Sequence, residues 1–186
     1  MECNKNNRMV VAGLKFDKPE IKEIANDEGY TNPAIQLLAL LVVLGAIIAF
    51  FIGNGGSSGL ARMGLKGFGA AVGEFGSLAI GVFLSAYIMV YVIRIFKVKP
   101  TYQAILRVYG VAVIWLLLKT VFVAVLPSLA LAGILFWLAY NFVVLFGLTE
   151  LTGIKLWQSF LSIVLTFAAV FVIMIVYGMV IKAIFA

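Results

Sequence analysis

Five apolar stretches of membrane-spanning length occupy most of this 186-residue chain. A helix needs about 20 apolar residues to cross the hydrocarbon core of a bilayer, and each stretch is near that length. The stretches cover approximately residues 34–53, 67–93, 103–126, 128–148 and 157–183. The sequence therefore predicts an all-α integral membrane protein, with five transmembrane helices in a membrane domain over residues 34–186.

The composition argues against several other classes of protein. The chain is 64% hydrophobic and 12% charged, whereas a typical soluble domain is about 45–50% apolar and about 25% charged. It has no histidine, and its one cysteine, Cys3, lies in a polar segment. Disulfides, thiolate metal sites and His-based catalytic pairs are thus excluded. Nucleic-acid binding is also disfavoured, because the sequence shows no basic face with aromatic side chains. We expect a protein that is not an enzyme and that has no cofactor, no metal and no nucleic-acid partner.

Residues 1–33 form a polar segment, which we expect to be a cytoplasmic tail without a cleaved signal. It contains one predicted helix at about 17–28, because Ile21 and Ile24 share one face of an amphipathic pattern. The start and end signals are a capping-box pair, a proline in the first turn and a glycine past the last turn, namely Asp17 with Glu20, Pro19 and Gly29. We expect this helix to lie at the membrane interface, where its isoleucines contact lipid or a partner. A solvated linker is the alternative.

The distribution of lysine and arginine predicts the orientation of the chain. With the N-terminus in the cytoplasm, ten of these residues fall on the cytoplasmic side and three on the exterior side, and one lies within a span. This bias favours a cytoplasmic N-terminus and an exterior C-terminus. We expect Arg94, Lys97 and Lys99, in the short basic segment after the second span, to contact anionic lipid or a cytoplasmic protein partner. The short form of the chain favours a prokaryotic cell membrane.

Small residues recur every four positions in the second span, at Gly69, Gly73, Ser77, Gly81 and Ser85. In lipid, such a stripe lets helix backbones approach closely. We expect it to pack against a helix of the same chain or, as the alternative, of a second copy in a homo-oligomer. The letters GFGAAVG at the start of this span share some spacing with a phosphate-binding loop, but the chain lacks the alternating β/α pattern that such a loop requires.

Three polar side chains lie within the predicted spans. Glu74 and Lys119 fall in the outer halves of the second and third spans. A charge at the centre of the membrane costs about 2.5–3.5 kcal/mol on insertion scales, and both residues are expected to lie closer to the surface than that. Three alternatives are open for these two residues. Each side chain reaches headgroups or water separately, the two side chains form an ion pair, or both mark an ion or proton pathway. Asn141, in the fourth span, is expected to form a hydrogen bond with a neighbouring helix, with a substrate contact as the alternative.

Several motifs resemble the Yip-domain family of membrane proteins, especially its short bacterial and archaeal members. In FDKPEIKEIANDEGYTNPAIQLLALLVV (16–43), an Asp-x-Pro opens an interfacial helix and a Tyr-x-x-Pro-like step, Tyr30 to Pro33, leads into the first span. TYQAILRVYG (101–110) and WLAYNFVVLFGLTELTGIKLWQSF (137–160) resemble the later spans of the family. There, a Gly-Leu-x-Glu-x-x-Gly turn precedes the fifth span, and the matching positions are Gly147, Leu148, Glu150 and Gly153.

The resemblance implies five spans with a cytoplasmic N-terminus and an exterior C-terminus. Eukaryotic relatives are implicated in binding prenylated Rab GTPases and in vesicle trafficking, whereas for prokaryotic relatives the resemblance implies a fold without an established activity. We expect a non-enzymatic scaffold or adaptor that recruits a protein or lipid partner at the cytoplasmic face, with a relation to membrane trafficking or organisation. The alternative is a small ion-, solute- or lipid-translocating protein that uses Glu74, Lys119 and Asn141.

Overall fold

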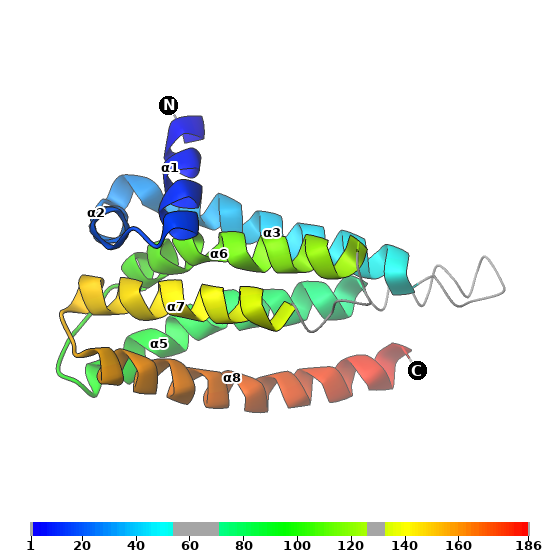
Figure 1. Cartoon of the computed structure of the whole chain (residues 1–186). Coiled ribbons are helices and arrows are strands. Elements are labelled where there is room, and N and C mark those ends of the chain that lie inside the picture. Colours follow the sequence, from blue (N-terminus) through cyan, green and yellow to red (C-terminus); the bar gives the residue numbers. More distant parts are fainter. Residues whose placement is uncertain (1, 54–70, 126–132, 186) are drawn as a thin grey trace.

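The computed structural model describes residues 2–53, 71–125 and 133–185, which form helices and short connections without a β-strand (Figure 1). The elements in chain order are α1 (Glu2–Lys15), α2 (Lys18–Asn26), a 3₁₀ turn (Glu28–Tyr30), α3 (Thr31–Gly53), helical residues 71–79 followed by a π-helical turn (Ile80–Leu84), α5 (Ser85–Arg94), α6 (Tyr102–Val125), α7 (Gly133–Thr152) and α8 (Leu156–Phe185).

Five helical stretches in this described part are long and apolar enough to cross a membrane: Glu28–Phe50, Ala71–Arg94, Tyr102–Phe122, Gly133–Thr152 and Leu156–Val180. The predicted fold class, an all-α protein with five membrane-spanning helices after an N-terminal helix, is therefore confirmed. The sequence also predicts a Gly/Ser-rich loop at 54–66 and a tight turn at Pro127 between the third and fourth spans. Both of these, and the small residue Gly69, lie outside the described residues.

The spans lie side by side along one axis, and α1 runs across that axis (Figure 1). α6 is the central helix, since it packs against α3, α7, α5, α1 and α2, whereas α8 lies at the edge against α5 and α7. α2 lies at one end of the bundle, together with the 95–101 connection and the 153–155 turn. We call this end of the bundle the α2 end.

α1 is a helix that the sequence analysis did not predict. Its apolar side chains Met9 and Ala12 are buried in the core. At Gly13 the helix backbone comes so close to the Val111 carbonyl that a side chain would collide with it, and the Trp115 indole N–H donates to the Gly13 carbonyl at 3.0 Å. α1 is therefore packed on α6 as part of the protein core.

α2 begins as predicted, because the Asp17 carboxylate accepts a hydrogen bond from the Glu20 backbone N–H at 3.2 Å. Its apolar face does not meet lipid, however. Ile21 and Ile24 are 1% and 0% exposed, and Ile21 lies against Gly147 of α7. The prediction that these two isoleucines contact lipid or a partner is therefore wrong, because the first turns of α6 and the last turns of α7 cover this face of α2.

Candidate functional site

The α2 end is held together by a buried arginine from α6. Arg107 is 4% exposed, and its Nε donates to the Ala25 carbonyl while its Nη1 donates to the Thr31 hydroxyl, both at 2.8 Å. A guanidinium offers five N–H donors in a fixed planar arrangement, so a single side chain can bind both groups. Arg107 was counted in the sequence only as a topology-determining charge, and its structural role was missed.

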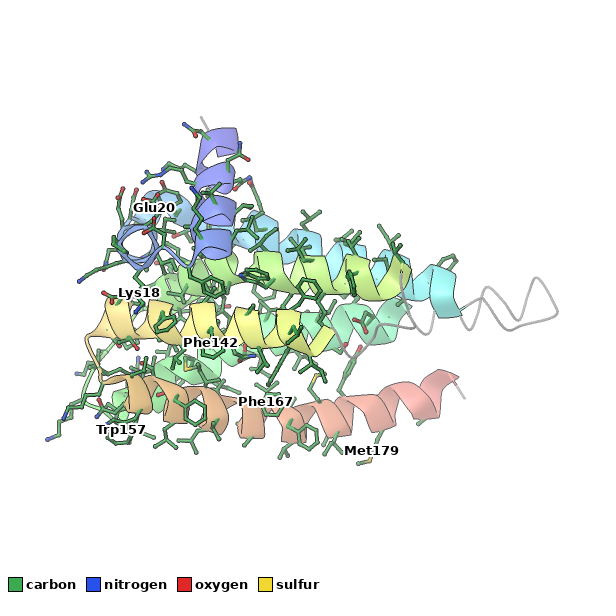
Figure 2. The ribbon with its side chains drawn as sticks, in the orientation of Figure 1. Lys18, Glu20, Phe142, Trp157, Phe167 and Met179 are labelled. Atoms are coloured by element: carbon green, nitrogen blue, oxygen red, sulfur yellow. The ribbon has the colours of Figure 1, made fainter. Side chains whose placement is uncertain are left out.

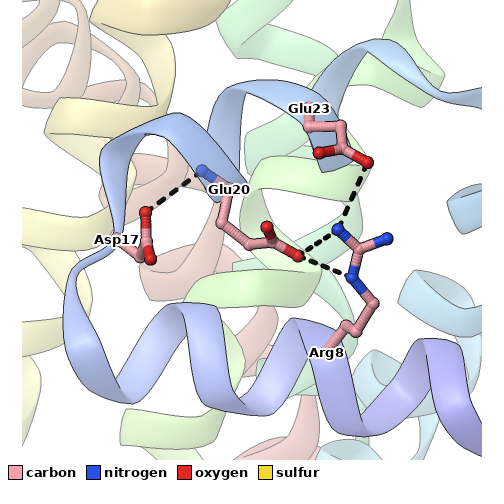
Figure 3. A network of polar contacts seen from close by, with 4 residues as sticks. All are labelled: Arg8, Asp17, Glu20 and Glu23. Atoms are coloured by element: carbon pink, nitrogen blue, oxygen red, sulfur yellow. Dashed lines mark hydrogen bonds and ion pairs between the residues drawn. The ribbon is translucent and has the colours of Figure 1, made fainter.

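A second polar network joins α1 to α2 near the surface (Figure 3). The Arg8 guanidinium donates to Glu20 at 2.7 Å and to Glu23 at 3.2 Å. Desolvation lowers the pKa of Arg8, but the hydrogen bonds with Glu20 and Glu23 raise it, and the pKa lies above its usual value. These exposed pairs orient the two helices with little net stabilisation.

Each position of the turn motif that resembles the Yip-domain family has a structural role. Gly147 lets α7 approach Val108 of α6, where a side chain would collide, and Leu148 is fully buried. The Glu150 carboxylate lies 3.8 Å from the Lys22 ammonium of α2. Gly153 has a φ of +67° in the turn before α8, a conformation that favours glycine.

The basic residues at the end of α5 and in the connection after it lie at the surface of the α2 end. Arg94, Lys97 and Lys99 are exposed, beside Ile95 at 68% exposure and Trp157 at 58%. The Phe96 and Trp157 rings pack edge to face with their centroids 6.1 Å apart. Exposed basic residues next to aromatic and aliphatic side chains are typical of a membrane–water interface.

The predicted stripe of small residues has a different role from the one expected. Nothing lies within 4 Å of the position that a side chain at Gly81 would take. Ser77 and Ser85 donate to carbonyls of their own helix, and the Ser85 hydroxyl also lies within hydrogen-bonding range of Tyr109 of α6. The prediction of close helix packing is therefore wrong at Gly81, and the close approach in this span occurs at Gly76, against Tyr177 of α8. Gly73 is half-buried.

Three members of the stripe, Ser77, Gly81 and Ser85, instead line a cavity of about 410 Å³ between the second span, α6, α7 and α8. It brings together residues that the sequence singled out separately: Ser77, Gly81, Ser85, Lys119 and Asn141. Tyr109, Tyr140 and Thr166 also line it, and these were missed because a tyrosine or threonine in an apolar span carries no distinctive spacing signal. The π-helical turn at Ile80–Leu84 lies in its wall, and such turns are frequent at functional sites.

The polar side chains in the spans lie apart from one another, and among the described residues the structure does not show the ion-pair alternative for Glu74 and Lys119. Asn141 Nδ2 donates to the Trp137 carbonyl of its own helix at 2.8 Å, so the predicted bond to a neighbouring helix is wrong for this donor. Glu74 is directed toward Gly45 of α3 and does not line the cavity with Lys119. The charge of Lys119 acts on Glu74, yet no ion pair joins them in the part of the chain that the structure describes.

A second hollow, of about 300 Å³, lies between α7 and α8. We call it the α7–α8 groove, and it is lined by Trp137, Leu138, Asn141, Phe142, Leu145, Phe160, Ile163, Val164 and Phe167. Apart from the one asparagine, every lining side chain is apolar or aromatic. Phe142 on α7 and Phe167 on α8 are labelled in Figure 2, and they are 50% and 56% exposed.

The fold and these sites define a multi-pass α-helical membrane protein with an intramembrane cavity. At one end, α1 and α2 form an ordered structure that we call the cap. Residues 17–178 match the family model of the Yip1 domain, and the chain belongs to this family. The match begins at Asp17, the N-cap residue of α2, and ends within α8, so it includes α2, the first four spans and most of the fifth. A comparison with curated proteins and a comparison with solved structures gave no match.

Proposed function

We propose that this protein is a non-enzymatic membrane adaptor whose α2 end lies in the cytoplasm and recruits a protein partner. The observation that carries the proposal is the preformed cap. Buried contacts from α6 and α7 hold α1 and α2 in place, including the Arg107 hydrogen bonds to Ala25 and Thr31. A surface that is ordered before binding reduces the entropy that association costs.

The outer face of α2 is mostly polar. The apolar side of α2 is buried within the protein, and apart from Pro19 the exposed residues of α2 and of the two positions after it are polar: Lys18, Lys22, Glu23, Asn26, Asp27 and Glu28. A charged surface of this kind supports fast, selective and reversible association. The basic segment with Arg94, Lys97 and Lys99 lies at the same end, and contact of its charges with anionic lipid would hold the cap at the membrane surface. A role in membrane trafficking or organisation fits the Yip1 family.

Site-specific photo-crosslinking in native membranes tests this function. A photoreactive residue replaces Glu28 or Lys99, two exposed side chains at the α2 end, and the control replaces exposed Met179, which lies far from Trp157 along α8 (Figure 2). We expect one soluble protein to crosslink at stoichiometric yield to both positions at the α2 end and not to the Met179 position. In the presence of Glu28→Lys, the yield at Lys99 should fall.

The absence of a shared soluble partner at these two positions would contradict the adaptor function. Crosslinks of equal yield from the Met179 position would contradict it as well, because they would show that capture does not depend on the cap.

A further inference from the structure

The cavity and the α7–α8 groove are continuous, because Trp137, Asn141, Ile163 and Phe167 line both. One part carries several polar side chains within a mostly apolar lining, and the other is apolar almost throughout and bordered by exposed side chains. At about 410 and 300 Å³, the two hollows lie in the range of about 300–1,000 Å³ typical of ligand sites. The shape therefore suits a molecule with a polar end and an apolar end.

Lys119 supplies the charge in the part with polar side chains. It lines the cavity, and its charge acts on Glu74, but among the described residues no carboxylate lies within 4.0 Å of its ammonium group. A cation within an apolar span is costly unless an anion or water accompanies it. The cavity is therefore complementary in charge to an anionic group.

Two further polar groups in the cavity lack protein partners. The Asn141 amide donates through Nδ2 only, and no described group donates to its Oδ1. The Tyr140 side chain packs against Tyr109 through its ring, and its hydroxyl has no hydrogen bond within the described part of the chain. The Tyr140 hydroxyl and the second N–H of the Asn141 amide can donate to the ester oxygens of a lipid, which lie between its phosphate and its acyl chains.

The groove extends from this polar part toward the α2 end. Lys119 lies 17 residues after the start of α6, and Phe160 lies four residues after the start of α8. At about 1.5 Å per residue, these positions differ in depth by roughly 20 Å, which is comparable to one leaflet of a hydrocarbon core about 30 Å thick. The long dimension of the site thus matches a lipid that stands in one leaflet.

From these observations, we infer that the cavity and the α7–α8 groove form a binding site for an anionic membrane lipid. Its phosphate lies against Lys119, its glycerol ester oxygens lie near Asn141 and Tyr140, and one acyl chain lies in the groove. The groove is open to the bilayer, so an acyl chain enters it laterally from the surrounding lipid. This site is separate from the cap and does not depend on the adaptor function.

Native mass spectrometry of the full chain tests the site. The protein is reconstituted in vesicles of phosphatidylcholine with a minor fraction of phosphatidylglycerol and then extracted in mild detergent. We expect one retained phosphatidylglycerol per chain, retention lowered about tenfold by Lys119→Gln, and retention preserved by Lys119→Arg. The matched control Lys155→Gln removes an exposed lysine at the α2 end and should retain lipid as the original chain does.

A second pair of variants tests the acyl-chain position. Val164→Trp fills the groove, whereas Val172→Trp adds the same bulk on an exposed part of α8 outside it. We expect only Val164→Trp to lower retention, while both variants keep the helicity and monodisperse elution of the original chain. Glycerol phosphate, which has the charge but no acyl chain, should not displace the lipid.

Three results would overturn the inference. Equal retention by Lys119→Gln and the original chain would show that the charge does not select the lipid, as would equal retention of phosphatidylcholine. Displacement by glycerol phosphate would indicate a site for a phosphate group alone. A mass of two chains without lipid would show that a second copy of the protein covers the groove.

Discussion

Among single residues, Arg107 has the largest expected effect on stability, because it binds groups from two other segments while buried. Arg107→Met removes the hydrogen bonds to the Ala25 carbonyl and the Thr31 hydroxyl. We expect the free energy of unfolding to fall by about 2–3 kcal/mol and the midpoint of thermal unfolding in detergent to fall by about 5–10 °C. Lys155→Met, which removes an exposed lysine at the same end, is the control and should change the midpoint little.

Gly147 provides a second prediction at this scale. A Cβ there would collide with Val108 and approach Ile21, so Gly147→Ala forces α7 away from α6 and α2. We expect a loss of about 1–3 kcal/mol in the free energy of unfolding, seen as a lower unfolding midpoint. Gly178→Ala makes the same change on α8, where nothing lies within 4 Å, and should leave the midpoint unchanged or slightly raised. Equal losses in the two variants would contradict the packing role of Gly147.

At the scale of elements, the sequence predicted the helices whose signals are local. The spans follow from apolar runs, and the start of α2 follows from the Asp17–Glu20 capping pair. α1 was missed because residues 2–15 mix polar and apolar side chains, and the partner that stabilises the helix lies about a hundred positions away, at Val111 and Trp115 of α6. The same reason explains the error at Ile21 and Ile24, because an amphipathic pattern does not say whether lipid or protein covers its apolar face.

The docking of α2 is open to a direct test. If Ile21 packs on α7, Ile21→Asn releases α2 and speeds trypsin cleavage after Lys22 in detergent solution. We expect about a tenfold faster cleavage, since a buried polar group without a partner costs about 1–3 kcal/mol. Glu28→Asn changes an exposed position just after the same helix and is the control. Unchanged cleavage in Ile21→Asn would contradict the docking of α2 on α7.

At the scale of the whole molecule, the cavity was not predictable from the sequence, although several of its residues were. The stripe with Ser77, Gly81 and Ser85 was identified correctly as a feature of the second span, but its spacing is equally compatible with close packing and with a cavity wall. Lys119 and Asn141 were identified because polar groups are rare in spans. Their common location depends on how the second span, α6, α7 and α8 are arranged, which no local pattern encodes.

The arrangement of the whole chain also makes the orientation testable from two positions. Ile95 lies in the connection before α6 at the α2 end, and Ala183 lies near the far end of α8, so the two are on opposite sides of the membrane (Figure 1). Both are exposed, and replacing either one leaves the charge bias intact. In a Cys3→Ser background, we introduce Ile95→Cys or Ala183→Cys and treat intact cells with a membrane-impermeant maleimide. Since basic residues favour the cytoplasmic side, Ala183→Cys should be labelled in intact cells and Ile95→Cys only after the membrane is opened. The opposite pattern would place the cap outside the cell and would contradict a cytoplasmic adaptor, while leaving the lipid site intact.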